Sequence, residues 1–140
     1  MDVTAIEPLT AAAHPTVIMV ADDYEVIRQL CRAWLETRGY AVVEAENGEE
    51  AVEIARRECP SLILMDVTMP LLDGFAATRR IREIKELCDV WIVAVSGIST
   101  GHREAALTAG CDEFLTKPFD FPQLEKVLGR LLSGPPRTAR

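Results

Sequence analysis

The segment LILMDVTMPLLDG, residues 62–74, carries the clearest strand signal in the sequence. It opens with apolar residues that do not alternate with polar ones, as expected for a strand covered on both faces, and then places a carboxylate at Asp66. Two other segments have the same form, VIMVADD at 17–23 and WIVAVSG at 91–97. Strands of this kind are typical of a parallel sheet that lies between two layers of helices.

Around these segments the chain alternates short strands with helices. We predict strands at 17–20, 40–43, 62–65, 91–95 and 114–115, and the second and fifth are short or mixed enough to lie at the sheet edges. This alternation predicts an α/β fold with a doubly wound five-stranded parallel sheet of the (βα)5 type. We expect the domain to span residues 16–132, between a flexible lead-in over 1–15 and a flexible tail over 133–140.

Caps and periodicity predict the helices. Asn47 is the expected N-cap of the second helix and Asp120 that of the fifth, while the fourth is expected over about residues 100–109. The residues expected to face the core are Ile27, Leu30, Cys31, Trp34 and Leu35 of the first helix and Ala77, Ile81, Ile84 and Cys88 of the third.

The composition excludes several classes of function. Of 140 residues, 49% are apolar and 26% charged, as in a globular domain of ordinary size. The net charge of −7 argues against nucleic-acid binding, which requires a basic surface. No segment indicates a membrane span or a signal peptide. The four cysteines form no metal motif, so we interpret them as core thiols of a reduced, cytoplasmic protein.

Polar groups follow the predicted strands at the carboxyl edge of the sheet, where parallel sheets bind their ligands. Three converging carboxylates would repel one another unless a cation such as Mg²⁺ neutralised them, and a lysine and a hydroxyl beside them suit a phosphoryl group. The residues that carry these groups are Asp22, Asp23, Asp66, Ser96 and Lys117.

Simpler interpretations stand beside this one. Single aspartates after strands commonly cap helices, and Asp23 and Asp73 are both placed to do so. Glu44, at the end of the second strand, is expected in solvent because that strand lies at the sheet edge.

The sequence resembles the receiver domain of bacterial two-component response regulators, whose archetype is a single-domain chemotaxis regulator. The resemblance implies the flavodoxin-like strand order 2-1-3-4-5. The matching segments are VIMVADDYEVIRQL, NGEEAVEIA, LILMDVTMPLLDGFAATRRIR, WIVAVSG and AGCDEFLTKPF.

The resemblance also implies a role for each site residue. It makes Asp66 the phosphoacceptor and Lys117 the partner of the phosphoryl group, with a cis Lys117–Pro118 peptide. It makes Ser96 and Phe114 the switch pair. It implies Mg²⁺, or Mn²⁺ in its place, held by Asp22, Asp23, Asp66 and the backbone carbonyl of Thr68.

The switch region departs from the commoner residues of that family. Ser96 stands where threonine is commoner, and Phe114 lacks the hydroxyl of tyrosine, so we expect it to switch by packing alone. We hypothesise that Ile98 shields the acyl phosphate from water, and an unchanged hydrolysis rate in Ile98→Glu would contradict this. His14 and His102 are interpreted as surface residues.

The resemblance implies a switch that supports only its own phosphorylation and slow autodephosphorylation, not an enzyme. Its implied partners are a histidine kinase or phosphotransfer protein, and a downstream protein bound by the face of the fourth helix, fifth strand and fifth helix. A monomer at rest is expected, with dimerisation on phosphorylation left open, as is origin from a hybrid kinase. Two alternatives are a metal-dependent phosphatase with an aspartyl nucleophile, which would need an aspartate where Thr68 stands, and an unphosphorylated receiver-like scaffold.

Overall fold

The computed structural model describes residues 15–98 and 101–137. The lead-in predicted over 1–15, with His14, lies outside the described residues except for Pro15. The strands are β2 (Val17–Ala21), β3 (Ala41–Ala45), β4 (Leu62–Asp66), β5 (Trp91–Ser96) and β6 (Glu113–Thr116). The helices are α1 (Glu25–Thr37), α2 (Gly48–Glu58), α3 (Gly74–Arg82), the short 3-10 helix η2 (Lys85–Leu87), α4 (His102–Ala109) and α5 (Phe121–Leu132).

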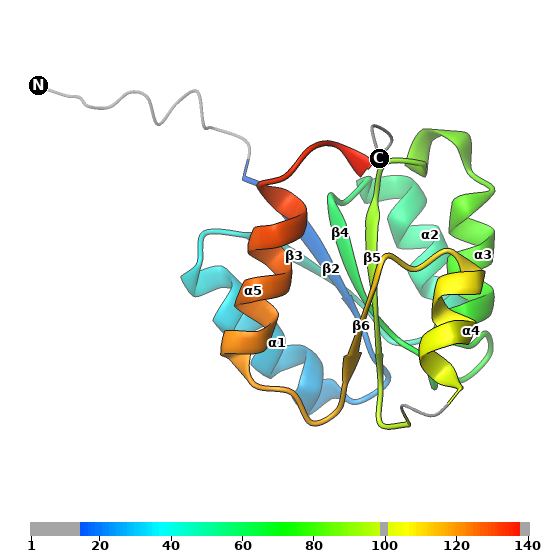
Figure 1. Cartoon of the computed structure of the whole chain (residues 1–140), viewed down its shortest axis with the longest axis horizontal. Coiled ribbons are helices and arrows are strands. Elements are labelled where there is room, and N and C mark those ends of the chain that lie inside the picture. Colours follow the sequence, from blue (N-terminus) through cyan, green and yellow to red (C-terminus); the bar gives the residue numbers. More distant parts are fainter. Residues whose placement is uncertain (1–14, 99–100, 138–140) are drawn as a thin grey trace, which may run out of the picture.

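The five strands form one parallel sheet in the order β3-β2-β4-β5-β6. This is the predicted order 2-1-3-4-5, with the second and fifth strands at the edges. The carboxyl ends of the strands point away from the described ends of the chain, which both lie at the opposite side of the sheet (Figure 1). The arrangement therefore separates the carboxyl ends of the strands from the described ends of the chain.

Helices cover both faces of the sheet, α1 and α5 on one and α2, α3 and α4 on the other (Figure 1). Successive residues of a strand point to opposite faces, so each central strand supplies both cores. In β2, Ile18 packs with the α1–α5 core that includes Leu35 and Leu124, whereas Met19 packs with the core that includes Ile81. Because β4 is buried along its whole length, its apolar run needs no alternation.

The helix caps predicted at Asn47 and Asp120 are confirmed, whereas Asp23 does not cap α1, since the N-cap of that helix is Tyr24 and makes no side-chain capping bond. The Asn47 side chain accepts a hydrogen bond from the Glu50 N–H at 2.7 Å. Asp120 and Gln123 form a reciprocal capping box at the start of α5. Asp73 caps α3 by accepting from the Ala76 N–H at 2.8 Å, as the simpler interpretation of that residue expected.

The predicted core face of α1 is wrong at Leu30, which is 54% exposed. The buried positions of this helix are Arg28, Cys31 and Leu35, and Leu30 lies about 100° round the helix from Cys31. Arg28 is buried because its guanidinium donates to the Asp22 backbone carbonyl at 2.8 Å. The apolar periodicity of α1 therefore could not predict that an arginine, Arg28, is one of its buried residues.

Glu44 is not the solvated residue that its edge strand predicted. Its carboxylate accepts hydrogen bonds from Arg28 Nε at 2.9 Å and from Arg32 Nε at 2.6 Å. Burial alone would raise the pKa of Glu44, but the bonds from Arg32 and Arg28 outweigh it and lower the pKa. The edge strand is therefore tied to α1 by a charged cluster.

Two of the four cysteines contradict the prediction that all are core thiols. Cys31 and Cys111 are buried, whereas Cys59 and Cys88 are exposed. Cys59 ends α2 in a left-handed conformation with φ 46°. Cys88 lies after the 3-10 helix η2, because α3 stops at Arg82 instead of continuing through the predicted stripe.

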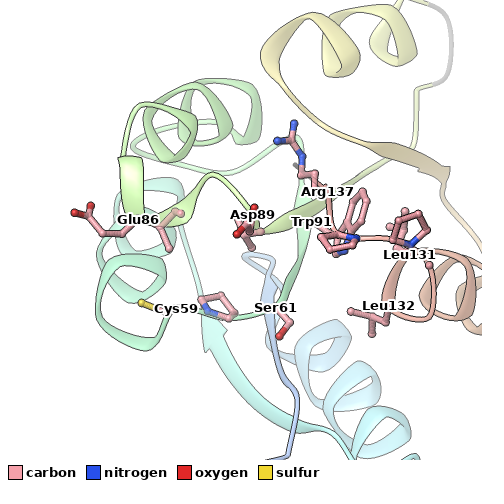
Figure 2. Close-up of a pocket in the computed structure, with 14 residues that line it drawn as sticks. Cys59, Ser61, Glu86, Asp89, Trp91, Leu131, Leu132 and Arg137 are labelled. Atoms are coloured by element: carbon pink, nitrogen blue, oxygen red, sulfur yellow. The ribbon is translucent and has the colours of Figure 1, made fainter. Parts of the chain in front are cut away.

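The tail predicted as flexible over 133–140 makes hydrogen bonds at Arg137, the last residue that the structure describes. Arg137 donates to the Asp112 carboxylate at 2.8 Å and to the Cys88 carbonyl at 3.0 Å. Together with the amino ends of β4 and β5, this segment encloses a pocket of about 460 Å³. Figure 2 shows that pocket with Trp91 and Leu132 on one side and Glu86 on the other. It lies at the sheet edge opposite to Asp66.

Among the described residues, no helix has both the length and the apolar composition required to cross a membrane.

Asp112 links three parts of the fold, so its loss should destabilise the protein. Its carboxylate accepts from Arg82 and Arg137 at 2.8 Å each and from the Ile92 N–H at 2.9 Å. In urea unfolding we expect Asp112→Ala to lower the free energy of unfolding by roughly 3 kcal/mol, since the largely buried guanidinium of Arg82 is left without its carboxylate. Arg137→Ala, which removes only the more exposed partner, should cost about 1 kcal/mol or less. Equal losses in the two variants would contradict this account.

Candidate functional site

The predicted site residues converge at the carboxyl edge of the sheet. Asp66 is the last residue of β4 and Ser96 the last of β5, while Asp22 directly follows β2. The Asp22 N–H donates to the Ala45 carbonyl of β3 at 3.0 Å, so hydrogen bonding between the strands fixes the backbone position from which the Asp22 carboxylate extends. Lys117 directly follows β6 and enters from the edge of the sheet.

Three carboxylates form one cluster. Asp22, Asp23 and Asp66 each offer an oxygen atom, and these atoms all lie within 4.8 Å of one another. Asp22 and Asp66 are buried and Asp23 is exposed, so the cluster opens to solvent on the Asp23 side. The Tyr24 N–H donates to Asp22 Oδ1 at 2.9 Å and orients that carboxylate.

Lys117 supplies a positive charge to the cluster. Its Nζ lies 3.2 Å from Asp22 Oδ2 and 3.3 Å from Asp66 Oδ1. Burial alone would lower the pKa of Lys117, but the charges of Asp66 and Asp22 outweigh it and raise the pKa, so the side chain stays an ammonium. The Lys117–Pro118 peptide is cis, as predicted, and the Lys117 N–H donates to the Ser96 carbonyl at 2.8 Å.

The lysine does not neutralise the cluster completely. Burial and the neighbouring charge of Asp22 raise the pKa of Asp66 from 3.8 to about 6, although Lys117 acts in the opposite direction. Carboxylate oxygens at this spacing are the ligands that hard divalent cations such as Mg²⁺ prefer. The donor set therefore fits such a cation, and Asp22, Asp23 and Asp66 are the residues that would hold it.

The loop after Asp66 is held close to the site by a glycine. The Gly74 N–H donates to the Val67 carbonyl at 2.8 Å, and a Cβ at Gly74 would lie 2.3 Å from the Asp66 backbone oxygen. Only glycine fits this close approach without moving the strand end. A cavity of about 180 Å³ opens here, lined by Asp23, Tyr24, Asp66, Thr68, Gly97 and Lys117. Thr68 thus borders the cavity, and the role of its carbonyl as a ligand stays a prediction.

Ser96 lies beside this cavity with its hydroxyl bonded elsewhere. Ser96 Oγ lies 2.9 Å from His102 Nδ1, donates to the Ile98 carbonyl at 3.1 Å and accepts from the Ile98 N–H at 3.0 Å. Interpreting His102 as a surface residue was therefore wrong. The sequence did not predict this contact, because the first residue of α4 could not be placed accurately enough to show that His102 would reach Ser96.

Phe114, the other predicted switch residue, is buried in the core between the sheet and α2–α4. The guanidinium of Arg103 lies over its ring, with Cζ 5.0 Å from the ring centroid. Such a cation–π contact holds an aromatic side chain in place in addition to its packing.

Comparison with known proteins gives this arrangement a family. Residues 18–129 match the family described as "Response regulator receiver domain". The chain is 36% identical over 120 residues to the chemotaxis protein CheY of Halobacterium salinarum, a match that covers 84% of this chain and 97% of that protein. The chain belongs to the response regulator receiver family.

Solved structures show the same fold. The receiver domain of the sensor histidine kinase PA1611 from Pseudomonas aeruginosa, described with a magnesium ion coordinated in its active-site cleft, aligns with a TM-score of 0.80 at 34% identity, covering 86% of this chain and all of that one. The receiver domain of Ssk1 from Saccharomyces cerevisiae, solved with the phosphotransfer protein Ypd1, aligns with a TM-score of 0.78 at 26% identity, covering 84% and 88%. The chain spans about half the length, 46–47%, of other curated relatives that it matches.

The raised pKa of Asp66 predicts how stability depends on pH without divalent cations. The folded-state pKa of about 6 lies above the ordinary 3.8, so the folded chain takes up a proton over this range and becomes more stable as the pH falls from 7 to 4. Asp66→Asn removes the buried charge. We therefore expect the free energy of unfolding of this variant to exceed that of the wild type by on the order of 1–3 kcal/mol at pH 7.5 and to equal it below about pH 4.

Urea unfolding with EDTA at a series of pH values measures this difference. Asp73→Asn is the matched control, because asparagine also caps helices and Asp73 lies outside the cluster. A difference in unfolding free energy between Asp66→Asn and the wild type that does not change with pH would contradict the raised pKa of Asp66.

Proposed function

We propose that this chain is a phosphorylation switch in which Asp66 accepts a phosphoryl group from the phosphohistidine of a histidine kinase or phosphotransfer protein. The observation that carries the proposal is the Asp66 carboxylate at the end of a buried strand, between Asp22 and the ammonium of Lys117. Membership of the receiver family and the Ssk1 domain solved with Ypd1 support the same direction of transfer.

In this reaction an Asp66 carboxylate oxygen attacks phosphorus and forms an acyl phosphate. The P–N bond of the phosphohistidine breaks, and its electron pair returns to the imidazole nitrogen. Lys117 Nζ, 3.3 Å from Asp66 Oδ1, is placed to contact the phosphoryl oxygens. Mg²⁺ held by Asp22, Asp23, Asp66 and the Thr68 carbonyl would neutralise the charge that the incoming group adds.

Water would take the phosphoryl group from Asp66 by hydrolysis, without a protein side chain acting as general base toward that water. A phosphatase of the aspartyl-nucleophile type needs an acid–base group two residues after its nucleophile, and Thr68 at that position cannot supply it. We therefore propose a phosphoacceptor that supports its own phosphorylation and slow autodephosphorylation, not an enzyme acting on other molecules.

An exposed apolar surface beside the site is suited to the phosphodonor. On α1, Val26 is 65% exposed and Leu30 54%. An apolar groove of about 410 Å³ adjoins them, lined by Ile27, Leu30, Cys31, Lys117, Pro118, Phe119 and Phe121. Because Lys117 belongs to both the groove and the acidic cluster, a protein seated on this surface would bring its phosphohistidine to Asp66.

The output side of the proposal is the face of α4, β6 and α5. Phe114 lies in β6 and contacts Arg103 of α4, and Ser96 contacts the preceding residue of that helix, His102. Movement at Ser96 would therefore be transmitted to this face through the first turn of α4. We propose that a downstream protein binds there, that the chain is monomeric at rest, and that it acts in the cytoplasm without contacting nucleic acid or membrane.

The direct test uses a small phosphodonor. Incubation with acetyl phosphate and Mg²⁺ should add one phosphoryl group, about 80 Da, and peptide mapping should place it on Asp66. Asp66→Asn should abolish the adduct, whereas Asp73→Asn should retain it. Replacing Mg²⁺ by EDTA should remove most of the labelling. An adduct that survives Asp66→Asn would overturn the proposal.

The donor surface is tested by a matched pair of exposed leucines. Leu30 on α1 and Leu107 on α4 are 54% and 52% exposed. For an autophosphorylated histidine kinase that labels the wild type, Leu30→Glu should slow phosphotransfer at least tenfold, because a charge is buried in the apolar interface. Leu107→Glu should transfer normally, and both variants should accept from acetyl phosphate at wild-type rates. Equal effects of the two variants would contradict the assignment of this surface.

A further inference from the structure

We propose that His102 is a positioning residue that holds the Ser96 hydroxyl away from Asp66 and thereby sets how readily the switch responds. The inference rests on the proposed function of Asp66 as phosphoacceptor. It concerns a contact between the end of β5 and the first residue of α4, Ser96 Oγ to His102 Nδ1 at 2.9 Å.

The hydroxyl hydrogen of Ser96 is already donated to a protein acceptor in the resting chain. The side chain is almost completely buried, at 2% exposure, and its oxygen contacts His102 Nδ1, the Ile98 carbonyl and the Ile98 N–H. A hydroxyl has one hydrogen. Either it donates to His102, or it donates to the Ile98 carbonyl while the His102 N–H donates to it. In both cases the proton is committed on the side of α4.

A phosphoryl group on Asp66 would offer only acceptor oxygens, so Ser96 can contact it only by redirecting that proton. When that proton is donated to His102, redirecting it breaks the bond to His102; when it is donated to the Ile98 carbonyl, the bond from the His102 N–H breaks once Ser96 Oγ moves toward Asp66. The bond between Ser96 and His102 therefore stabilises the resting state relative to the state in which the Ser96 hydroxyl contacts the phosphoryl group. Any change that weakens this bond should favour the second state.

The His102 ring is itself held in place from a second side. It packs against Phe75 of α3, edge to face, with ring centroids 5.4 Å apart and an interplanar angle of 85°. Phe75 follows Gly74, whose N–H bonds to the Val67 carbonyl one residue after Asp66. The contact between Ser96 and His102, which we call the latch, is thus connected through Phe75 to the same loop that follows Asp66.

The first turn of α4 contacts both switch residues. His102 bonds Ser96, and the next residue, Arg103, lies over the ring of Phe114. The N-cap of α4 is Gly101, which has no side chain to cap the helix, so these two contacts do much to fix the turn. Breaking the Ser96 bond would therefore loosen the turn that covers Phe114.

The experiment measures binding of beryllofluoride, a non-covalent mimic of the phosphoryl group, with Mg²⁺ by NMR titration of the folded chain. We expect His102→Ala to bind about 2- to 10-fold more tightly than the wild type, the effect of losing one hydrogen bond from the resting state. His102→Gln, which retains a polar side chain, should recover part of the wild-type affinity. Leu107→Ala, an exposed residue of the same helix, is the control and should bind like the wild type.

A double-mutant cycle separates the latch from a general loosening of α4. In a Ser96→Ala background, His102→Ala should have no further effect, because the bond is already absent. An equal gain in both backgrounds, or no gain in either, would overturn the inference while leaving the proposed function intact.

A measurement without any phosphoryl mimic keeps the two proposals distinguishable. In the unphosphorylated chain, scalar couplings should show one Ser96 χ1 rotamer in the wild type and averaging between rotamers in His102→Ala. A single unchanged rotamer in the variant would overturn the latch. Failure of the wild type to bind beryllofluoride or to accept phosphate at Asp66 would instead overturn the proposed function.

Discussion

One ammonium group among three carboxylates is the constraint on which the site depends. Lys117 reaches both Asp22 and Asp66, yet it follows the edge strand β6 and must pass the end of β5 to do so. β5 ends there at Ser96 and is followed by Gly97, and these two small residues leave space for the lysine side chain. The strand order and the small residues at this point are thus conditions for the charge balance, and burial together with the neighbouring charge of Asp22 accounts for the raised pKa of Asp66.

The features that follow from chain direction and burial could be predicted from the sequence. Apolar runs such as residues 62–65 identify strands covered on both faces, and a parallel sheet then brings the residues at their carboxyl ends together. Asp22, Asp66 and Lys117 could be placed at one site for this reason. The caps at Asn47 and Asp120 were also predictable, because a capping bond involves residues only three positions apart.

Contacts between side chains of different elements could not be predicted in this way. The exposure of Leu30 depends on how α1 is rotated against the sheet, and the ion pairs of Glu44 depend on two arginines that reach it from α1. His102 meets Ser96, and Arg137 meets Asp112, only after α4 and the chain end have packed. Periodicity describes one element at a time and carries no information on such pairs.

The geometry separates capture of a phosphoryl group from the response to it. Lys117 Nζ already lies 3.3 Å from Asp66, so this donor needs no rearrangement, whereas the Ser96 hydroxyl is bonded to the Ile98–His102 side. The two donors are nevertheless connected, since the Lys117 N–H bonds to the Ser96 carbonyl. If Asp66 accepts a phosphoryl group as proposed, neutralisation of the added charge can precede the movement of Ser96, so the two proposals assign Lys117 to the modification of Asp66 and His102 to the response to it.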